Sequence, residues 1–468
     1  MNNQNKFNPV ALNIAVIGGG VVGCAVARKL ALSGAKVTLL EKAPDILDGA
    51  SKGNSAILHT GFDAPPNSLE WQCVQEGHSE YLKIHQELNL PLMKTGAMVA
   101  AWTAEEESRL SDVLEKGLAN GVADLQLLDR AQILKKEPHL SPDVRAAIYI
   151  PREYVIDPWS APLAYLLQAI NNGGRALFNA EVTGGTFDGL HWQLRTGQGL
   201  VQARYVINCA GLYGDLVDQA VLGSSKFTIK PRKGQFVVYD KAARSLINSI
   251  ILPVPSKRTK GIVLFPTIFG NMMVGPTAEE QDGRDDASVD NKTLDMLARK
   301  GLAMLPELRD MPVTATYAGI RPATERPEYR IVEDPDRHWI TLGGIRSTGL
   351  TAALGIANHV HKLLEEQGAT FTPLEDPVVT PVPNLAEHLP RDYSKPGYGE
   401  IVCHCEMVTL REIQAALTGQ LPAGSLSGLK RRTRATMGRC QGFFCSARLA
   451  ELTQDTFIEP LGLEKKDA

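Results

Sequence analysis

A glycine-rich turn between two short apolar segments, near the start of the chain, restricts the possible folds most strongly. Residues 13–17 form an apolar strand pattern that leads into Gly-Gly-Gly-Val-Val-Gly at 18–23, and an alanine-rich helical pattern follows over 24–33. A second strand pattern over 36–40 ends at Glu41. In a strand, Gly-x-Gly-x-x-Gly, helix, strand and acid series, the helix N-terminus attracts phosphate and the acid accepts hydrogen bonds from ribose hydroxyls. We therefore predict a Rossmann-like α/β domain that binds a dinucleotide through Gly18, Gly20, Gly23 and Glu41.

Further pieces of this domain recur later in the chain. An apolar strand pattern over 203–208 runs into Cys209-Ala210-Gly211, and another over 339–342 runs into Gly343-Gly344. The segments between them mix helical and strand patterns, which suits one discontinuous second domain. Six prolines between 373 and 396 favour an extended connector. The predicted units are a dinucleotide-binding domain from 12–76, 151–223 and 333–372, a discontinuous α+β substrate domain from 77–150 and 224–332, a linker over 373–398, and a small C-terminal helical domain over 399–456.

Composition and charge narrow the class of protein. The 468 residues include 49 Lys and Arg against 52 Asp and Glu, which gives a net charge of -3. A general nucleic-acid footprint is therefore not expected. Neither a secretory signal pattern nor a run of about 18 apolar residues occurs, so we expect no transmembrane segment. The chain is predicted to be cytoplasmic, with peripheral attachment at the inner membrane through a partner as an option.

Four of the seven cysteines gather in the C-terminal unit. They form the pairs Cys403-x-Cys405 and Cys440-x4-Cys445. Four thiolates suit a 2Fe-2S cluster or zinc, and their softness does not separate the two. Zinc sites more often use pairs two to four residues apart, which favours iron and sulfur for the tight first pair. Nearby basic residues are expected to balance an anionic cluster rather than to bind nucleic acid. They are Lys430, Arg431, Arg432, Arg434 and Arg439.

Additional motifs carry a family resemblance. Glu41-Lys42 is followed by Gly49-Ala50-Ser51 and by the segment from Asn54 to His59-x-Gly61, and later by Gly319-Ile320-Arg321-Pro322 and Gly343-Gly344-Ile345-Arg346-Ser347-x-Gly349. From about 12 to 370, this pattern resembles the FAD-dependent D-amino-acid-oxidase-like superfamily. The tail resembles the cluster-binding domain of the anaerobic-type glycerol-3-phosphate dehydrogenase large subunit, which is similar to bacterioferritin-associated ferredoxin. The resemblance implies FAD and a 2Fe-2S cluster held by Cys403, Cys405, Cys440 and Cys445.

The resemblance also assigns the FAD contacts. The glycine loop, Glu41 and Lys42 would hold the ADP half, while Ser51 and Asn54 match positions near the pyrophosphate and the ribityl chain. A helix beginning near Gly349 would point its N-terminus at the flavin pyrimidine edge, where the positive end of its dipole stabilises the negative charge of the reduced ring. The remaining implied contacts are Val182, Gly211, Gly344 and Leu350.

Arg321 is the expected anchor for an anionic substrate. The matching arginine of glycine oxidase pairs with the substrate carboxylate, and a guanidinium makes two parallel charge-assisted bonds to such a group. A structural arginine paired with Glu325 or Glu328 is the alternative.

His59 is the expected general base, because hydroxy-acid members of the superfamily place a residue at this position against the flavin and histidine titrates near neutral pH. A histidine that only packs or hydrogen-bonds near the isoalloxazine, or one that attaches FAD covalently, is the alternative. Arg346 in the late loop and Lys233 in Pro-Arg-Lys-Gly are secondary site candidates, and either could instead be a solvated charge.

The expected function is FAD-dependent oxidation of a small CH-OH substrate, either glycerol 3-phosphate or a 2-hydroxy acid, with electrons leaving to a partner subunit or a quinone-linked acceptor. Glycerol-3-phosphate dehydrogenases usually have Gly-Gly-Lys in the late loop, whereas this chain has Gly-Gly-Ile-Arg, which favours a carboxylate substrate. Two alternatives stay open. One is an amino-acid or opine dehydrogenase acting on CH-NH, and the other is an electron-transfer subunit without a substrate of its own.

Overall fold

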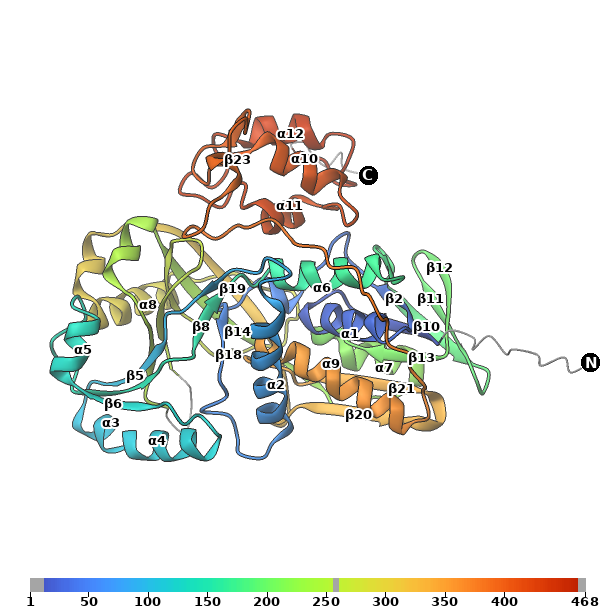
Figure 1. Cartoon of the computed structure of the whole chain (residues 1–468), viewed down its shortest axis with the longest axis horizontal. Helices are drawn as coiled ribbons and strands as arrows, with labels where there is room; N and C mark the ends of the chain where they lie inside the picture. Colours follow the sequence, from blue (N-terminus) through green and yellow to red (C-terminus); the bar gives the residue numbers. More distant parts are fainter. Residues whose placement is uncertain (1–11, 256–260, 462–468) are drawn as a thin grey trace, which may run out of the picture.

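The computed structural model describes residues 12–255 and 261–461. Figure 1 shows two lobes side by side, with the C-terminal domain lying above them where they meet. We name the lobes by their sheets. The first lobe contains β1 (Asn13–Ile17), and the second lobe contains β14 (Ile229–Tyr239).

The first lobe has a six-stranded sheet in the order β20 (Arg330–Asp334), β21 (Trp339–Gly343), β13 (Tyr205–Asn208), β1, β2 (Lys36–Leu40) and β9 (Arg175–Leu177). All neighbouring strands are parallel except β20, which is antiparallel to β21. Ile17 at the end of β1 pairs with Leu40 on one side and Asn208 on the other. Strands buried on both faces read as continuous apolar runs, and this explains the unbroken apolar pattern of β1.

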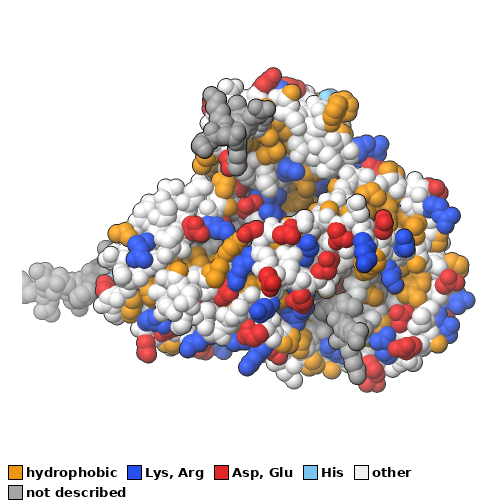
Figure 2. All heavy atoms as spheres, turned by 180° about the vertical axis from the view of Figure 1, so that it is seen from behind, with side chains coloured by type: hydrophobic (Ala, Val, Ile, Leu, Met, Phe, Trp, Pro, Cys, Tyr) orange, Lys and Arg blue, Asp and Glu red, His pale blue; other side chains and the backbone are white. Residues whose placement is uncertain are grey.

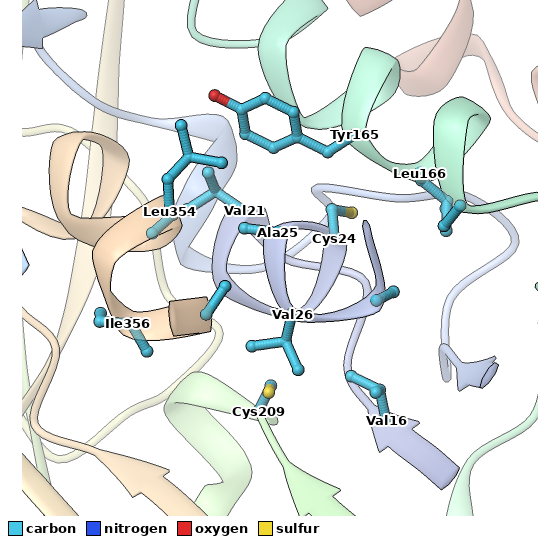
Figure 3. Packing of buried hydrophobic residues seen from close by; sticks show 14 of the residues in the cluster. Val16, Val21, Cys24, Ala25, Val26, Tyr165, Leu166, Cys209, Leu354 and Ile356 are labelled. Carbon is cyan, nitrogen blue, oxygen red and sulfur yellow. The ribbon is translucent and has the colours of Figure 1, made fainter. Parts of the chain in front are cut away.

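Four helices cover one face of this sheet: α1 (Val21–Leu32), α2 (Leu69–Ile84), α6 (Ser160–Asn171) and α9 (Gly349–Glu366). Figure 3 shows Cys24 and Ala25 of α1 among Tyr165 of α6 and Leu354 of α9. Helices α2 and α9 pack closely, because a Cβ on Gly355 would lie only 2.2 Å from the carbonyl oxygen of Cys73. Helix α2 therefore packs as one piece on the first lobe, across the boundary expected at residue 76.

The opposite face carries a three-stranded meander and a short helix. These are β10 (Val182–Phe187), β11 (Trp192–Thr196), β12 (Gly199–Ala203) and α7 (Gly214–Leu222). The ring of Trp192 in β11 meets that of Trp339 in β21 edge to face, with centroids 5.1 Å apart. Both faces of the parallel sheet are thus covered, as a Rossmann-like domain requires.

The second lobe is a nine-stranded mixed sheet. Its path is β18 (Glu279–Glu280), β14, β17 (Met272–Gly275), β16 (Val263–Pro266), β15 (Ile250–Pro253), β5 (Ala97–Ala101), β7 (Ala146–Ile150) and β6 (Gln126–Asp129), and β19 (Val313–Thr324) also pairs with β14. Strands β15 and β5 run parallel, with Ile250 opposite Ala97. Because β5 and β15 come from the two separate segments, their pairing joins these segments into one sheet. The lobe's helices include α3 (Ala104–Ser108), α4 (Leu110–Ala119), α5 (Arg130–Lys136) and α8 (Asn291–Met304).

The C-terminal domain has a core of its own. It contains β22 (Ile401–Cys403), β23 (Val408–Thr409), α10 (Leu410–Thr418), α11 (Leu426–Thr433) and α12 (Ser446–Thr453). Ile413, Leu429 and Leu449, one from each helix, are fully buried at its centre. Within residues 12–255 and 261–461, no helix combines the length and the apolar character that crossing a membrane requires.

Candidate active site

A cavity of about 1010 Å³ lies where the carboxyl ends of β1 and β13 face the sheet of the second lobe. This is the position at which open α/β sheets bind their ligands. Most residues expected to contact FAD or substrate line it: Gly18, Gly20, Glu41, Lys42, Ser51, Asn54, His59, Val182, Gly211, Arg321, Gly344, Arg346, Gly349 and Leu350. Gly23 and Lys233 are not among the lining residues.

The glycine loop is shaped so that backbone can approach a ligand. Gly18 has a φ of +105°, and a Cβ there would lie 2.6 Å from the carbonyl oxygen of Cys209. Gly23 lets helix α1 pack closely against the loop, since a Cβ on Gly23 would lie 1.9 Å from the carbonyl oxygen of Gly18. Helix α1 begins after Gly20 without a side-chain cap, although the Val21 amide donates to Ser51 Oγ at 3.1 Å. Such a helix start suits a pyrophosphate, so these residues fit FAD.

Glu41 links the loop to the end of β2. Its Oε2 accepts a hydrogen bond from the Gly19 amide at 2.5 Å, and its Oε1 accepts one from the Ala43 amide at 2.8 Å. Burial raises the pKa of this carboxyl, and the two amide donors oppose that effect. Each carboxylate oxygen keeps a second lone pair, so Glu41 can hold the turn and still accept ribose hydroxyls. The neighbouring Lys42 ammonium lies 3.3 Å from the centre of the Tyr213 ring.

Asn54 and the start of α9 are further expected FAD contacts, and each has its own local structure. Asn54 shapes its own loop, accepting from the Ala56 amide at 2.7 Å and donating to the Ser51 carbonyl at 3.0 Å. Helix α9 begins at Gly349, and its N-cap residue Thr348 makes no side-chain cap. The first turn of α9 therefore presents backbone amides to the cavity, where a negatively charged flavin edge would be stabilised.

Arg321 forms no ion pair with any described residue, although the nearby Glu279 carboxylate favours its charged form. It lies on β19 opposite Arg232 of β14, and its Nη2 donates to the Thr277 carbonyl at 2.9 Å. Its Nη1 is buried without a hydrogen-bond partner, and in the described ranges it forms no ion pair. Burial first, and then Arg232 and Arg346, lower the pKa of this guanidinium to about 10, so it stays charged at neutral pH. A buried charge is stable only when paired, which points to an anionic ligand.

The alternative partners of Arg321 are engaged elsewhere or absent. Glu325 pairs with Arg330, and among the described residues Arg321 forms no ion pair with Glu328. Arg346 lines the cavity and donates to the Pro327 carbonyl at 3.1 Å. Lys233 lies 3.9 Å from Asp286, outside the cavity lining.

His59 sits at the cavity end of a small three-stranded sheet formed by β3 (Ile57–Leu58), β8 (Tyr154–Ile156) and β4 (Leu92–Met93). Its Nδ1 lies 2.8 Å from Oε2 of Glu153, a side chain with no solvent exposure. Sequence reasoning missed Glu153, because its partner is 94 positions away and Arg-Glu-Tyr carries no motif. The two residues are brought together by the antiparallel pairing of Leu58 with Tyr154, and the sequence alone does not reveal this register.

The four tail cysteines lie near one another. The Cys405 thiol interacts with those of Cys440 and Cys403, and the Cys445 thiol interacts with those of Cys403 and Cys440. Among residues 12–255 and 261–461, no three His, Cys, Asp or Glu side chains are arranged around a single metal ion. Four neighbouring cysteine thiols are the donor set that a 2Fe-2S cluster takes.

Three basic residues of the tail form ion pairs with carboxylates. Arg432 and Arg434 are buried and pair with Asp45 and Glu406, at 2.7 Å and 2.9 Å. Arg439 pairs with Asp240 of the second lobe at 2.7 Å. Arg432 and Arg439 thus neutralise carboxylates of the two lobes, and Arg434 neutralises one within the C-terminal domain. The expected role of the basic residues in balancing the cluster stays a prediction. On the back face in Figure 2, acidic and basic side chains are intermixed.

A Rossmann-like first lobe with a glycine loop, a buried arginine and a histidine in one cavity is typical of a nucleotide-dependent oxidoreductase. Residues 13–363 match the FAD dependent oxidoreductase family (DAO), and residues 401–454 match the BFD-like [2Fe-2S] binding domain. The chain belongs to this FAD-dependent oxidoreductase family and carries a 2Fe-2S-binding domain at its C-terminal end. The matches confirm the predicted fold class, the cofactors FAD and a 2Fe-2S cluster, and the class of FAD-dependent dehydrogenase.

Two curated relatives and two solved structures illustrate the family. The chain is 33% identical over 466 residues to glycerol 3-phosphate dehydrogenase of Caloramator mitchellensis, covering 97% of this chain and 96% of that protein. It is 29% identical over 284 residues to human mitochondrial L-2-hydroxyglutarate dehydrogenase, covering 57% and 61%. The dithionite-reduced L-alpha-glycerophosphate oxidase of Mycoplasma pneumoniae with FAD bound superimposes with a TM-score of 0.72 at 28% identity, covering 79% and 97%. Glycine oxidase from Geobacillus kaustophilus shares the fold, with a TM-score of 0.69 at 21% identity, covering 78% and 98%.

Proposed function

We propose that this dehydrogenase oxidises the secondary alcohol of glycerol 3-phosphate to a ketone. The observation that carries the proposal is Arg321, which lines the FAD cavity and whose buried Nη1 has no hydrogen-bond partner among the described residues. Arg232 and Arg346 stand close enough to lower its pKa, whereas Glu279 opposes them and Arg232 also pairs with Glu280, so an anion would find three guanidinium groups nearby. A phosphate dianion compensates these groups better than a single carboxylate does. The relative that matches nearly the whole chain, a glycerol 3-phosphate dehydrogenase, supports the same substrate.

Each site residue then has one task. Arg321 binds the phosphate and thereby orients the carbinol carbon, which converts part of the binding energy into alignment. His59, in the same cavity, accepts the hydroxyl proton as the C-H bond breaks. FAD, when bound, supplies the two-electron acceptor for the hydride. The amides at the start of α1 and α9 would neutralise the pyrophosphate and the reduced ring, respectively.

The onward path of the electrons is part of the proposal. Cys403, Cys405, Cys440 and Cys445 would hold the 2Fe-2S cluster, and Cys405 and Cys440 are partly exposed to solvent. A one-electron carrier at the surface allows two electrons from the flavin to leave singly. We propose that the acceptor is a partner subunit or a quinone-linked protein.

Anaerobic flavin bleaching tests the substrate. Glycerol 3-phosphate, 2-hydroxyglutarate, lactate, glycine and proline would each be mixed with the holoenzyme while the oxidised-flavin absorbance is followed. Glycerol 3-phosphate should bleach it with the highest second-order rate constant. If a 2-hydroxy acid bleaches the flavin faster, the substrate is a carboxylate, as the Gly-Gly-Ile-Arg loop suggests. If only a reduced protein partner bleaches the flavin, the chain is an electron-transfer subunit.

A further inference from the structure

We propose that Glu153 is a positioning residue that sets the tautomer and the orientation of His59. This inference rests on the proposed function, in which His59 takes the substrate proton. The inference adds a buried carboxylate to the proposed proton-accepting site at His59. Glu153 itself lies outside the cavity lining.

Backbone pairing brings the two side chains together. Leu58 at the end of β3 is registered against Tyr154 at the start of β8, so His59 leaves the sheet at the point where Glu153 enters it. Residue 59 thus reaches residue 153 without a long or flexible side chain. The contact is a consequence of strand register, and it is therefore held as firmly as the small sheet itself.

The carboxylate is held from its other side by Thr60. Glu153 Oε1 accepts hydrogen bonds from the Thr60 backbone amide at 2.6 Å and from Thr60 Oγ1 at 2.8 Å. Glu153 Oε2 then faces His59 Nδ1 at 2.8 Å. With both oxygens engaged and the side chain fully buried, the carboxylate has little freedom to rotate.

This geometry decides which ring nitrogen carries the proton. A carboxylate only accepts hydrogen bonds, so Nδ1 must donate and the lone pair of a neutral imidazole resides on Nε2. A base needs that lone pair. When His59 accepts the substrate proton, it becomes an imidazolium next to a buried negative charge, which stabilises the charge that develops. Glu153 is thus placed to act on the rate through His59 and without touching the substrate.

Replacing the carboxylate with its amide tests the inference. In Glu153→Gln the amide nitrogen can donate to Nδ1, which moves the ring proton to Nε2 and removes the base. Misoriented or wrongly protonated bases typically cost a factor of about 10² to 10⁴. We expect the limiting rate of anaerobic flavin reduction by glycerol 3-phosphate to fall by about 100-fold or more. The substrate Kd, the FAD content and the flavin spectrum should stay within about threefold of the wild type.

Three further variants separate positioning from a structural role. Thr60→Val removes one hydrogen bond to the same carboxylate but not the contact with His59, so its rate should change by less than about fivefold. Glu153→Asp keeps the charge and should recover at least tenfold over Glu153→Gln, and it replaces that variant as the test if Glu153→Gln does not fold. Adding Glu153→Gln to His59→Ala should cost little beyond His59→Ala alone, because residues that act as a unit are not additive.

The outcomes distinguish the two levels of the proposal. If His59→Ala is slow while Glu153→Gln and Glu153→Asp match the wild type, Glu153 does not position the base, and the proposed function stands. Additive losses in the double variant, or FAD loss in step with activity, mark Glu153 as a structural residue and overturn the inference. If His59→Ala itself reduces flavin at the wild-type rate, the base assignment fails and the inference fails with it.

Discussion

Arg432 of the C-terminal domain donates two hydrogen bonds to the carboxylate of Asp45 in the first lobe, from Nη2 to Oδ1 at 2.7 Å and from Nη1 to Oδ2 at 2.8 Å. Asp45 lies four residues beyond Glu41, the acid at the end of β2. Both partners are almost completely buried. The contact is so close that a Cβ on Gly428 would lie only 1.6 Å from an Asp45 carboxylate oxygen. The C-terminal domain therefore packs directly on the loop that follows Glu41, the acid proposed to bind the FAD ribose.

Removal of this pair should loosen the C-terminal domain. Truncating one partner of a buried ion pair leaves an uncompensated charge and typically costs about 3–5 kcal/mol. We expect Arg432→Ala to lower the urea midpoint of the C-terminal domain and to speed proteolysis within 373–398, with FAD retained. Arg448→Ala is the matched control, since Arg448 pairs with Glu400 at the surface, where loss costs about 0–1 kcal/mol. Equal effects of the two changes would refute a special role for the buried pair.

Arg321→Ala should weaken substrate handling without affecting the cofactors. Loss of one partner of a desolvated charged pair costs about 2–5 kcal/mol, and each 1.4 kcal/mol is tenfold. The second-order rate constant for flavin reduction should therefore fall by about 30-fold or more. Arg145→Ala, which removes a surface pair with Glu107, should leave it unchanged. Loss of FAD together with activity would identify Arg321 as a structural residue.

Gly23→Ala should yield protein depleted of FAD. The added methyl would collide with the carbonyl of Gly18 and push the glycine loop out of its shape. Gly214→Ala is the control, because Gly214 has helical dihedrals and its nearest neighbour would be 4.0 Å away. The ratio of flavin absorbance to protein absorbance after purification measures both. A Gly23→Ala protein with full FAD would show that the loop tolerates displacement.

Acid should weaken the seating of the C-terminal domain. Burial alone would raise the pKa of Glu406, but Arg434 and Lys241 lower it below its usual value. Since the folded pKa is depressed, the stabilisation is present above the unfolded value near 4.3 and is lost as pH falls through the folded value. We expect linker proteolysis to accelerate below about pH 4, and Glu406→Gln to flatten this pH dependence. An unchanged profile in Glu406→Gln would assign the effect to other groups.

Thiol labelling should separate the two groups of cysteines. Burial raises the pKa of Cys73 to about 12 and raises those of Cys24 and Cys209 still further above their usual value. Amides, led by that of Phe444, instead lower the pKa of Cys440. After iron removal by a chelator, iodoacetamide at pH 8 should modify Cys440 quickly and the three buried cysteines only on unfolding. Mass spectrometry after digestion measures this, and labelling of Cys440 at the same rate before iron removal would exclude it as a ligand.

Features formed by neighbouring residues were predictable, and features formed by distant ones were not. The glycine loop and Glu41 lie within 24 positions, so their spacing alone implies a shared turn. Glu153 acquires its role only through strand pairing with a segment far before it. In the same way, no local pattern reveals that Arg432 meets the carboxylate of Asp45, 387 positions away. The sequence shows that charged residues such as Glu153 and Arg432 are present, but the tertiary fold determines which residues they contact.

The parallel pairing of β5 with β15 also governs how the chain must fold. Neither large sheet can be complete early in synthesis. The sheet of the second lobe includes the late strand β19, and the sheet of the first lobe includes the late strand β21. Such long-range pairings are slow to form, and their edges stay unpaired until late partners arrive. The C-terminal domain, whose core residues all fall between Val402 and Leu461, needs no such wait. The C-terminal domain can thus close without either lobe, and Arg432 and Asp45 then meet when separately formed units dock.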